Sequence, residues 1–240
     1  MLPNLFTTGG LFAGFYAIIA AAQGQFDNAA IAIFIAAVLD GLDGRVARLT
    51  NTQSEFGVQY DSLADLISFG LAPSMLMYHW ALHSLRLDGV TPGKIGWVGA
   101  FLYAACAALR LARFNSQVGT VDKRWFIGLA SPAAAGLMAS FVWTCVNFDL
   151  TGPSLRYVAL GVTVTAGLLM VSLFRYVSFK GSGPRNDRVP FLAIVAVMAI
   201  VVAIAIDPPT VLLSVTAVYA LSAPLLWLLR KLRRQSESPA

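Results

Sequence analysis

The strongest constraint on this chain is a succession of long apolar segments that carry no charged side chain. Several are about 18–20 residues long, the length at which a helix crosses the hydrocarbon core of a bilayer. Only 12% of the residues are charged and 58% are hydrophobic, whereas a soluble domain has about a quarter of its residues charged. The sequence therefore predicts an all-α integral membrane protein and excludes a soluble globular domain.

The apolar pattern predicts about eight transmembrane helices, separated by short polar connections. The expected spans are 5–23, 28–48, 57–80, 96–114, 127–148, 155–178, 189–206 and 210–229. The clearest change of composition is the segment Gly181-Ser182-Gly183-Pro184. We therefore expect a six-helix core over residues 1–180, a linker over 181–188, two appended helices over 189–229 and a basic tail over 230–240.

Lysine and arginine are distributed unevenly between the two predicted membrane faces. With the N-terminus in the cytosol, fourteen basic residues fall on the cytosolic side, and Arg86, Lys94 and Arg156 fall outside. Positive charge concentrates in cytosolic loops, so we expect both termini in the cytosol. The net charge of +5 then reflects topology and attraction to anionic lipids. No basic module stands free of the membrane to bind nucleic acid.

Four aspartates flank the connection between the second and third predicted helices. Asp40 and Asp43 lie three residues apart near the end of the second helix. Asp61 and Asp65 lie four residues apart near the start of the third. Residues at these spacings share one face of a helix. Because the two helices are expected to form an antiparallel hairpin, both pairs should meet near its cytosolic end.

Such a cluster of acids needs compensating positive charge. Each aspartate costs about 2.5–3.5 kcal/mol near the centre of a membrane helix, and four carboxylates also repel one another. Oxygen ligands without nearby histidine or cysteine favour Mg²⁺ or Mn²⁺ over zinc. Two divalent ions would balance the four charges and form the arrangement used for in-line displacement at phosphorus. The alternative is a structural hairpin whose acids pair with Arg45 and Arg48, although two arginines cannot neutralise four acids.

Small residues and one arginine accompany the acids. Gly44 and Gly57 each cost about 1 kcal/mol in a helix relative to alanine. Together with Ala47 they would let a flat base and a diphosphate approach the backbone closely. Arg48 could bind phosphate oxygens through two parallel hydrogen bonds.

These residues follow a recognisable pattern. Asp-x-x-Asp-Gly-x-x-Ala-Arg begins at Asp40, and Gly-x-x-x-Asp-x-x-x-Asp follows at Gly57 after eight residues. The pattern resembles the signature of the CDP-alcohol phosphatidyltransferase family. In that family, transmembrane helices hold a CDP-linked lipid, an alcohol displaces CMP with the help of divalent metals, and a homodimer is usual. The resemblance implies metal binding by Asp40, Asp43 and Asp61, and general-base catalysis by Asp65, which would also touch a metal. It implies a nucleotide and diphosphate site lined by Gly44, Ala47, Arg48 and Gly57.

Further segments are similar to the bacterial phosphatidylserine synthase branch of the family, notably 3–8, 65–73 and 108–115. The similarity implies transfer of phosphatidyl from CDP-diacylglycerol to L-serine, in a bacterial inner membrane with the active site facing the cytosol. Arg110 and Arg113, one helical turn apart, could bind the serine carboxylate, or could only mark the cytosolic boundary of the fourth span. Asn115 and Ser68 could bind the amino group or make polar contacts between helices.

The sequence leaves two other functions open. The same chemistry could use glycerol 3-phosphate, inositol phosphate or choline as the acceptor. A protein of another class, a cation transporter, could use membrane carboxylates as an ion path. Transporters usually place that path near the midplane between structural repeats, whereas this chain clusters its acids toward one face and shows no repeat.

Overall fold

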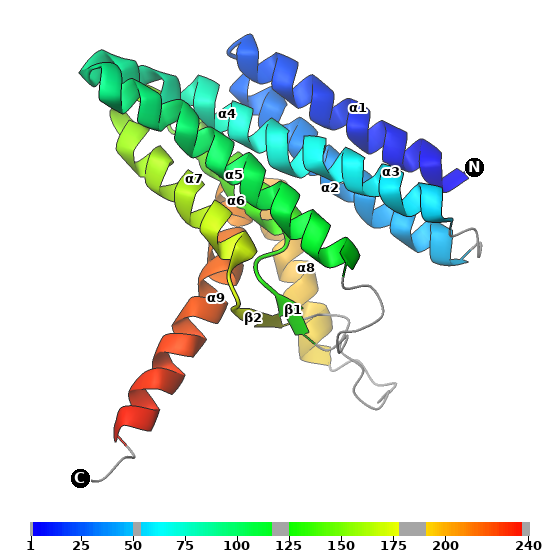
Figure 1. Ribbon diagram of the computed structural model, residues 1–240. Coiled ribbons are helices and arrows are strands. Elements are labelled where there is room, and N and C mark those ends of the chain that lie inside the picture. Colours follow the sequence, from blue (N-terminus) through cyan, green and yellow to red (C-terminus); the bar gives the residue numbers. More distant parts are fainter. Residues whose placement is uncertain (1, 50–53, 117–124, 178–190, 237–240) are drawn as a thin grey trace.

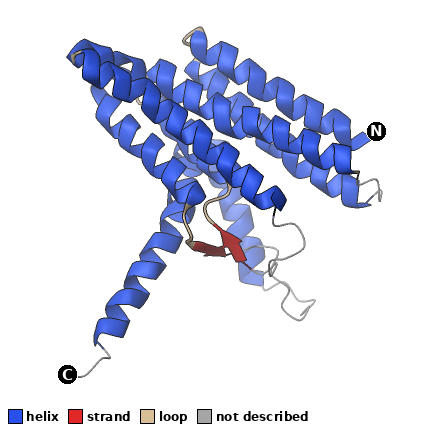
Figure 2. Cartoon of the chain, in the orientation of Figure 1, coloured by secondary structure: helices blue, strands red, loops and turns tan. Residues whose placement is uncertain are grey.

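The computed structural model describes residues 2–49, 54–116, 125–177 and 191–236, and these are almost entirely helical (Figure 2). The α-helices are α1 (Leu2–Ala22), α2 (Phe26–Leu49), α3 (Glu55–Asp65), α4 (Ala72–Trp80), α5 (Val90–Ser116), α6 (Ser131–Asn147), α7 (Arg156–Val171), α8 (Phe191–Ile206) and α9 (Pro208–Ser236). The other elements are the π-helix η1 (Leu66–Leu71), the 3₁₀-helices η2 (Leu82–Asp88) and η3 (Gly152–Leu155), and the strands β1 (Trp125–Ile127) and β2 (Arg175–Val177).

The all-α membrane class is confirmed. Each predicted span overlaps one helix or one continuous helical run, the third being α3, η1 and α4 together, and the helix of the fourth span begins earlier than expected, at Val90. Within the described residues, four helices are long and apolar enough to cross a membrane by length and composition alone. They are Asn4–Ala22, Val90–Ser116, Gly152–Val171 and Pro208–Trp227. A total of eight crossings stays a prediction, and the linker at 181–188 lies outside the described residues.

Helices α1, α2, α3–α4, α5 and α7 run with their long axes roughly aligned (Figure 1). The start of α1, the end of α2, the start of α3 and the end of α5 lie at the same end of this bundle (Figure 1). The interior between the helices is rich in alanine: Ala17, Ala36, Ala107 and Ala139 are fully buried. Small side chains let helix backbones approach closely where lipid removes the hydrophobic drive for association.

The third helical run is not a uniform α-helix. The backbone N–H of Ala72 donates to the carbonyl of Ile67, five residues earlier, at the widened turn η1. Pro73 follows directly after Ala72. A proline lacks an N–H, and its ring clashes with the carbonyl four residues before it, so an α-helix could not pass through this point undisturbed. The π-helical turn lets the chain continue as helix from Glu55 to Trp80.

A two-stranded antiparallel sheet corrects two of the predicted helix boundaries. β1 pairs with β2, with Phe126 opposite Tyr176. The predicted span 127–148 therefore begins only at Ser131, and 155–178 ends at Val171. Gly128 adopts a φ of +81°, and its N–H donates to the carbonyl of Phe174 at 2.8 Å. Apart from Arg175 the strands are as apolar as a helix end, which is why hydropathy extended both spans too far.

The last helix attaches to the bundle through its N-terminal half. α9 packs against α6, where the hydroxyls of Thr216 and Ser140 lie 3.3 Å apart. The Tyr176 hydroxyl on β2 donates to the carbonyl of Ala220 at 2.9 Å. Beyond this contact the C-terminal part of α9 extends away from the other helices (Figure 1).

Candidate active site

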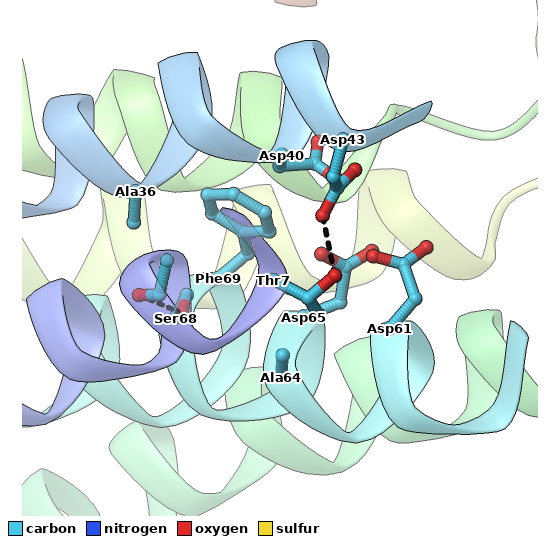
Figure 3. Close-up of a pocket in the computed structure, with 10 residues that line it drawn as sticks. Thr7, Ala36, Asp40, Asp43, Asp61, Ala64, Asp65, Ser68 and Phe69 are labelled. Atoms are coloured by element: carbon cyan, nitrogen blue, oxygen red, sulfur yellow. Dashed lines mark hydrogen bonds between the residues drawn. The ribbon is translucent and has the colours of Figure 1, made fainter. Parts of the chain in front are cut away.

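The four aspartates point toward one another from two helices (Figure 3). One carboxylate oxygen from each of Asp40, Asp61 and Asp65 can be chosen so that all three lie within 4.8 Å of one another. These three side chains are half-buried, whereas Asp43 is only 5% exposed. The convergence predicted from the spacing of the acids is therefore present in the structure.

Helix α1 supports the site from the side. It packs against both α2 and α3, which make few contacts with each other. The Thr7 hydroxyl donates to a carboxylate oxygen of Asp43 at 2.8 Å, and the Thr8 and Tyr60 hydroxyls lie 2.9 Å apart. A pocket lies between the carboxylates of α2 and α3. Its lining consists of Thr7, Gly10, Ala36, Asp40, Asp43, Asp61, Ala64, Asp65, Ser68 and Phe69.

The electrostatic balance of the pocket is dominated by negative charge. Asp65 is repelled by the charges of Asp40, Asp61 and Asp43, and is attracted by the guanidinium of Arg110 on α5. One guanidinium cannot balance four carboxylates. The donor set consists of hard oxygen atoms, and no histidine or cysteine lines the pocket. Such a set fits a divalent ion of the Mg²⁺ or Mn²⁺ type.

Of the residues predicted to bind the nucleotide and diphosphate, Gly44 and Gly57 lie on the two helices that carry the acids. A Cβ atom added at Gly44 would meet no atom within 4 Å, so the backbone of α2 is open to a ligand there. Gly57 lies in the first turn of α3, where its N–H donates to the Ser54 hydroxyl at 3.1 Å. Ala47 and Arg48 belong to α2, but their side chains lie outside the described residues.

The two arginines predicted to bind serine differ in their partners. Arg110 donates through Nη1 to the Ser131 hydroxyl at 2.7 Å, and its buried Nε has no hydrogen-bond partner among the described residues. Arg113 donates through Nη1 to the carbonyl of Val171 and through Nη2 to that of Ile127, at 3.3 and 3.0 Å. Arg113 thereby joins the end of α5 to α7 and β1.

The other two residues predicted to bind serine have protein partners. Asn115 donates through Nδ2 to the Ser62 hydroxyl at 3.0 Å, which connects α5 to α3 between Asp61 and Asp65 in sequence. Ser68 is buried, lines the pocket, and donates to the carbonyl of Gly10 on α1 at 3.1 Å. Both hydrogen bonds are polar contacts between helices, the second of the two roles expected for these residues.

Thr7 lines the pocket although it lies outside the acidic sequence pattern. A threonine within an apolar first helix has no distinctive sequence signal, because hydroxyls in such helices commonly bond to their own backbone. The available hint is the neighbouring run of small residues, Gly9, Gly10 and Gly14, which predicts close approach of another helix.

Fold and pocket together define a helical membrane protein with an acidic pocket, suited to divalent ions, at one end of its bundle. Residues 1–171 match the family model described as CDP-alcohol phosphatidyltransferase. The chain therefore belongs to the CDP-alcohol phosphatidyltransferase family. The matched region ends before β2, so α8 and α9 lie outside it.

Several curated relatives share one name, CDP-diacylglycerol–serine O-phosphatidyltransferase. The chain is 42% identical to the protein of that name from Helicobacter pylori strain J99 over 180 residues, covering 75% of this chain and 73% of the relative. It is 34% identical over 205 residues to the one from Mycobacterium tuberculosis strain H37Rv, covering 83% and 69%. It is also 34% identical over 187 residues to the one from Bacillus subtilis strain 168, covering 77% and 94%.

Proposed function

We propose that this protein transfers the phosphatidyl group of CDP-diacylglycerol to the hydroxyl of L-serine, giving phosphatidylserine and CMP. The observation that carries the proposal is the pocket in which Asp40, Asp43, Asp61 and Asp65 converge at the family signature. The choice of serine is supported by relatives at 34–42% identity that are named for this acceptor.

The four carboxylates would hold two divalent metal ions, Mg²⁺ or Mn²⁺. Bound there, the ions would supply charge stabilisation for the phosphoryl group and for departing CMP. Thr7 fixes one oxygen of Asp43 by its hydrogen bond and so orients that carboxylate within the pocket. Gly44, Ala47, Arg48 and Gly57 would line the site of the nucleotide and diphosphate.

Asp65 acts as the general base. Its carboxylate takes the proton of the serine hydroxyl while that oxygen forms a bond to the phosphorus bearing diacylglycerol. The bond from this phosphorus to the bridging oxygen of CMP breaks, and CMP leaves with the bonding electrons.

Among the four proposed serine-binding residues, we assign the carboxylate of serine to Arg110. Its guanidinium acts electrostatically on Asp65, and its Nε hydrogen has no partner in the described chain. Arg113, Asn115 and Ser68 already donate to protein groups, and we propose that they shape the acceptor site.

We further propose a location in the bacterial inner membrane, with the pocket and both termini facing the cytosol, and a homodimeric assembly. The distribution of basic residues, fourteen against three, supports this orientation. Cytosolic serine would then reach the pocket directly.

A panel of acceptors tests the function. Purified protein in vesicles containing CDP-diacylglycerol is given serine, glycerol 3-phosphate, inositol phosphate or choline, and CMP and lipid products are measured. We expect CMP release and phosphatidylserine with serine only. Release with glycerol 3-phosphate but not serine would leave the family chemistry intact and overturn the acceptor. An Asp65→Asn protein in the same vesicles controls for contaminating activity.

A further inference from the structure

The π-helical turn η1 begins immediately after Asp65, the proposed general base. In an α-helix the carbonyl of Phe69 would accept from the N–H of residue 73. That residue is Pro73, which has no N–H. The sequence therefore removes one hydrogen bond from the helix a single turn beyond Asp65, in a segment buried inside the bundle.

Tyr103 on α5 replaces the missing donor. Its hydroxyl donates to the carbonyl of Phe69 at 3.0 Å, and the whole side chain is buried. A buried tyrosine hydroxyl of this kind needs a partner, and so does the carbonyl. The hydrogen bond satisfies both groups and is made across 34 residues of sequence, from one helix to another.

Two further contacts hold the same turn. The Ser68 hydroxyl donates to the carbonyl of Gly10, and the Ser74 hydroxyl donates to that of Leu71 at 2.8 Å. α1 approaches so closely that a Cβ atom on Gly14 would lie 2.7 Å from the Cα of Ser68. The widened turn is thus held by α1 on one side and by α5 on the other.

The turn sets the direction in which the acids of α3 point. One residue advances an α-helix by about 100°, so a widened turn rotates α3 relative to α4 about the helix axis. Helix α4 cannot turn to compensate, because Leu76, Met77 and Trp80 are buried in the bundle. If η1 reverted to an α-helical turn, Asp61 and Asp65 would swing away from Asp40.

We propose that Tyr103 is a positioning residue for Asp65: by bonding to the Phe69 carbonyl, its hydroxyl maintains the π-helical turn that directs the acids of α3 into the pocket. This inference rests on the proposed function for its assay. It gives α5 a second role, the positioning of Asp65, in addition to the role proposed for Arg110 near its end.

The test compares two tyrosine-to-phenylalanine variants. Tyr103→Phe removes only the hydroxyl, and we expect kcat to fall about 10- to 100-fold, the scale of a misplaced catalytic group, with the KM for CDP-diacylglycerol within about twofold. Tyr157→Phe is the matched control, because its hydroxyl also makes one hydrogen bond, to Asp88 at 2.9 Å, but on η2, far from the acids in sequence. The control should keep its kcat.

A double variant separates positioning from stability. Pro73→Ala in the Tyr103→Phe background returns an N–H that can bond to the Phe69 carbonyl as in an α-helix. We expect the thermal midpoint of the double variant to exceed that of Tyr103→Phe while kcat stays low, because that bond favours closing the widened turn. Recovery of both quantities, or a normal kcat in Tyr103→Phe itself, would overturn the proposal.

Two outcomes of this test call for a second measurement. If Tyr103→Phe does not accumulate, Ser74→Ala removes another hydroxyl bonded to the turn, and it must lower kcat at unchanged KM or the inference is wrong. If the parent protein uses an acceptor other than serine, the acceptor assignment fails, and the same comparison is made with the acceptor that it does use.

Discussion

Asp65 is the residue at which the proposed chemistry is most sharply testable. It ends α3, points into the pocket with Asp40 and Asp61, and is acted on by the charge of Arg110. Asp65→Asn keeps the shape of the side chain but removes the base. Turnover should fall at least about 100-fold, the scale of losing a general base, while CDP-diacylglycerol still binds.

The control is Asp27→Asn, an exposed aspartate in the first turn of the same helix that carries Asp40. It should leave turnover unchanged. The test measures initial rates of CMP release and binding of CDP-diacylglycerol on the same preparations of both variants. Near-normal turnover in Asp65→Asn would move the base role to another residue.

The two arginines of α5 should respond differently to truncation. Arg110→Ala removes the proposed partner of the serine carboxylate, a charge-assisted bond worth about 1.5–3 kcal/mol, so the KM for serine should rise about 10- to 100-fold. Arg113→Ala leaves the carbonyls of Val171 and Ile127 without their donors. It should lower the thermal midpoint more than Arg110→Ala does. A normal serine KM in Arg110→Ala would remove Arg110 from the acceptor site.

At the level of elements, α2 and α3 bring their acids together without packing closely against each other. The resulting excess of negative charge predicts dependence on added metal. EDTA should abolish CMP release, and Mg²⁺ or Mn²⁺ should restore it. Asp61→Asn should raise the metal concentration needed for half-maximal activity. Full activity in chelator would refute the proposed metal site.

Much of the arrangement of the helices and of their acids could be predicted from the sequence. Hydropathy located the long α-helices of the described residues, although not all of their boundaries, because the length and polarity of a membrane helix are dictated by the bilayer. The spacing of the four aspartates predicted their convergence, because helix periodicity is fixed. The turn η1 was not predicted. Pro73 indicates that the α-helix is interrupted, but it does not indicate whether the helix kinks, ends or widens. In the structure the hydroxyls of Tyr103 and Ser68 make hydrogen bonds at this turn, and in each bond the two partners are distant in sequence.

The sheet of β1 and β2 was missed for a related reason. Its strands are three residues long, and apart from Arg175 they continue the apolar composition of the neighbouring helices. Only their pairing and the positive φ of Gly128 separate them from those helices. The roles of Arg110 and Arg113 could not be distinguished either, because the carbonyls that engage Arg113 belong to β1 and to the end of α7.

For the whole molecule, the uneven distribution of basic residues predicts which ends of the helices face the cytosol. Single cysteines are introduced after the buried Cys106 and Cys145 have been replaced. Cysteines at positions 118 and 183 should react with an impermeant reagent from the cytosolic side. Cysteines at positions 90 and 151 should react from outside. The reverse pattern would place the pocket on the face without serine and overturn the proposed orientation.

The acids belong to α2 and α3, and the end of α2 and the start of α3 lie at the end of the bundle where α1 begins (Figure 1). In the proposed reaction this location joins two phases. CDP-diacylglycerol and phosphatidylserine diffuse in the plane of the bilayer, while serine and CMP exchange with bulk water. The rate then depends on the mole fraction of the donor among the membrane lipids and on the molar concentration of serine. Diluting the donor with inert lipid slows the enzyme even when the total amount of donor is unchanged.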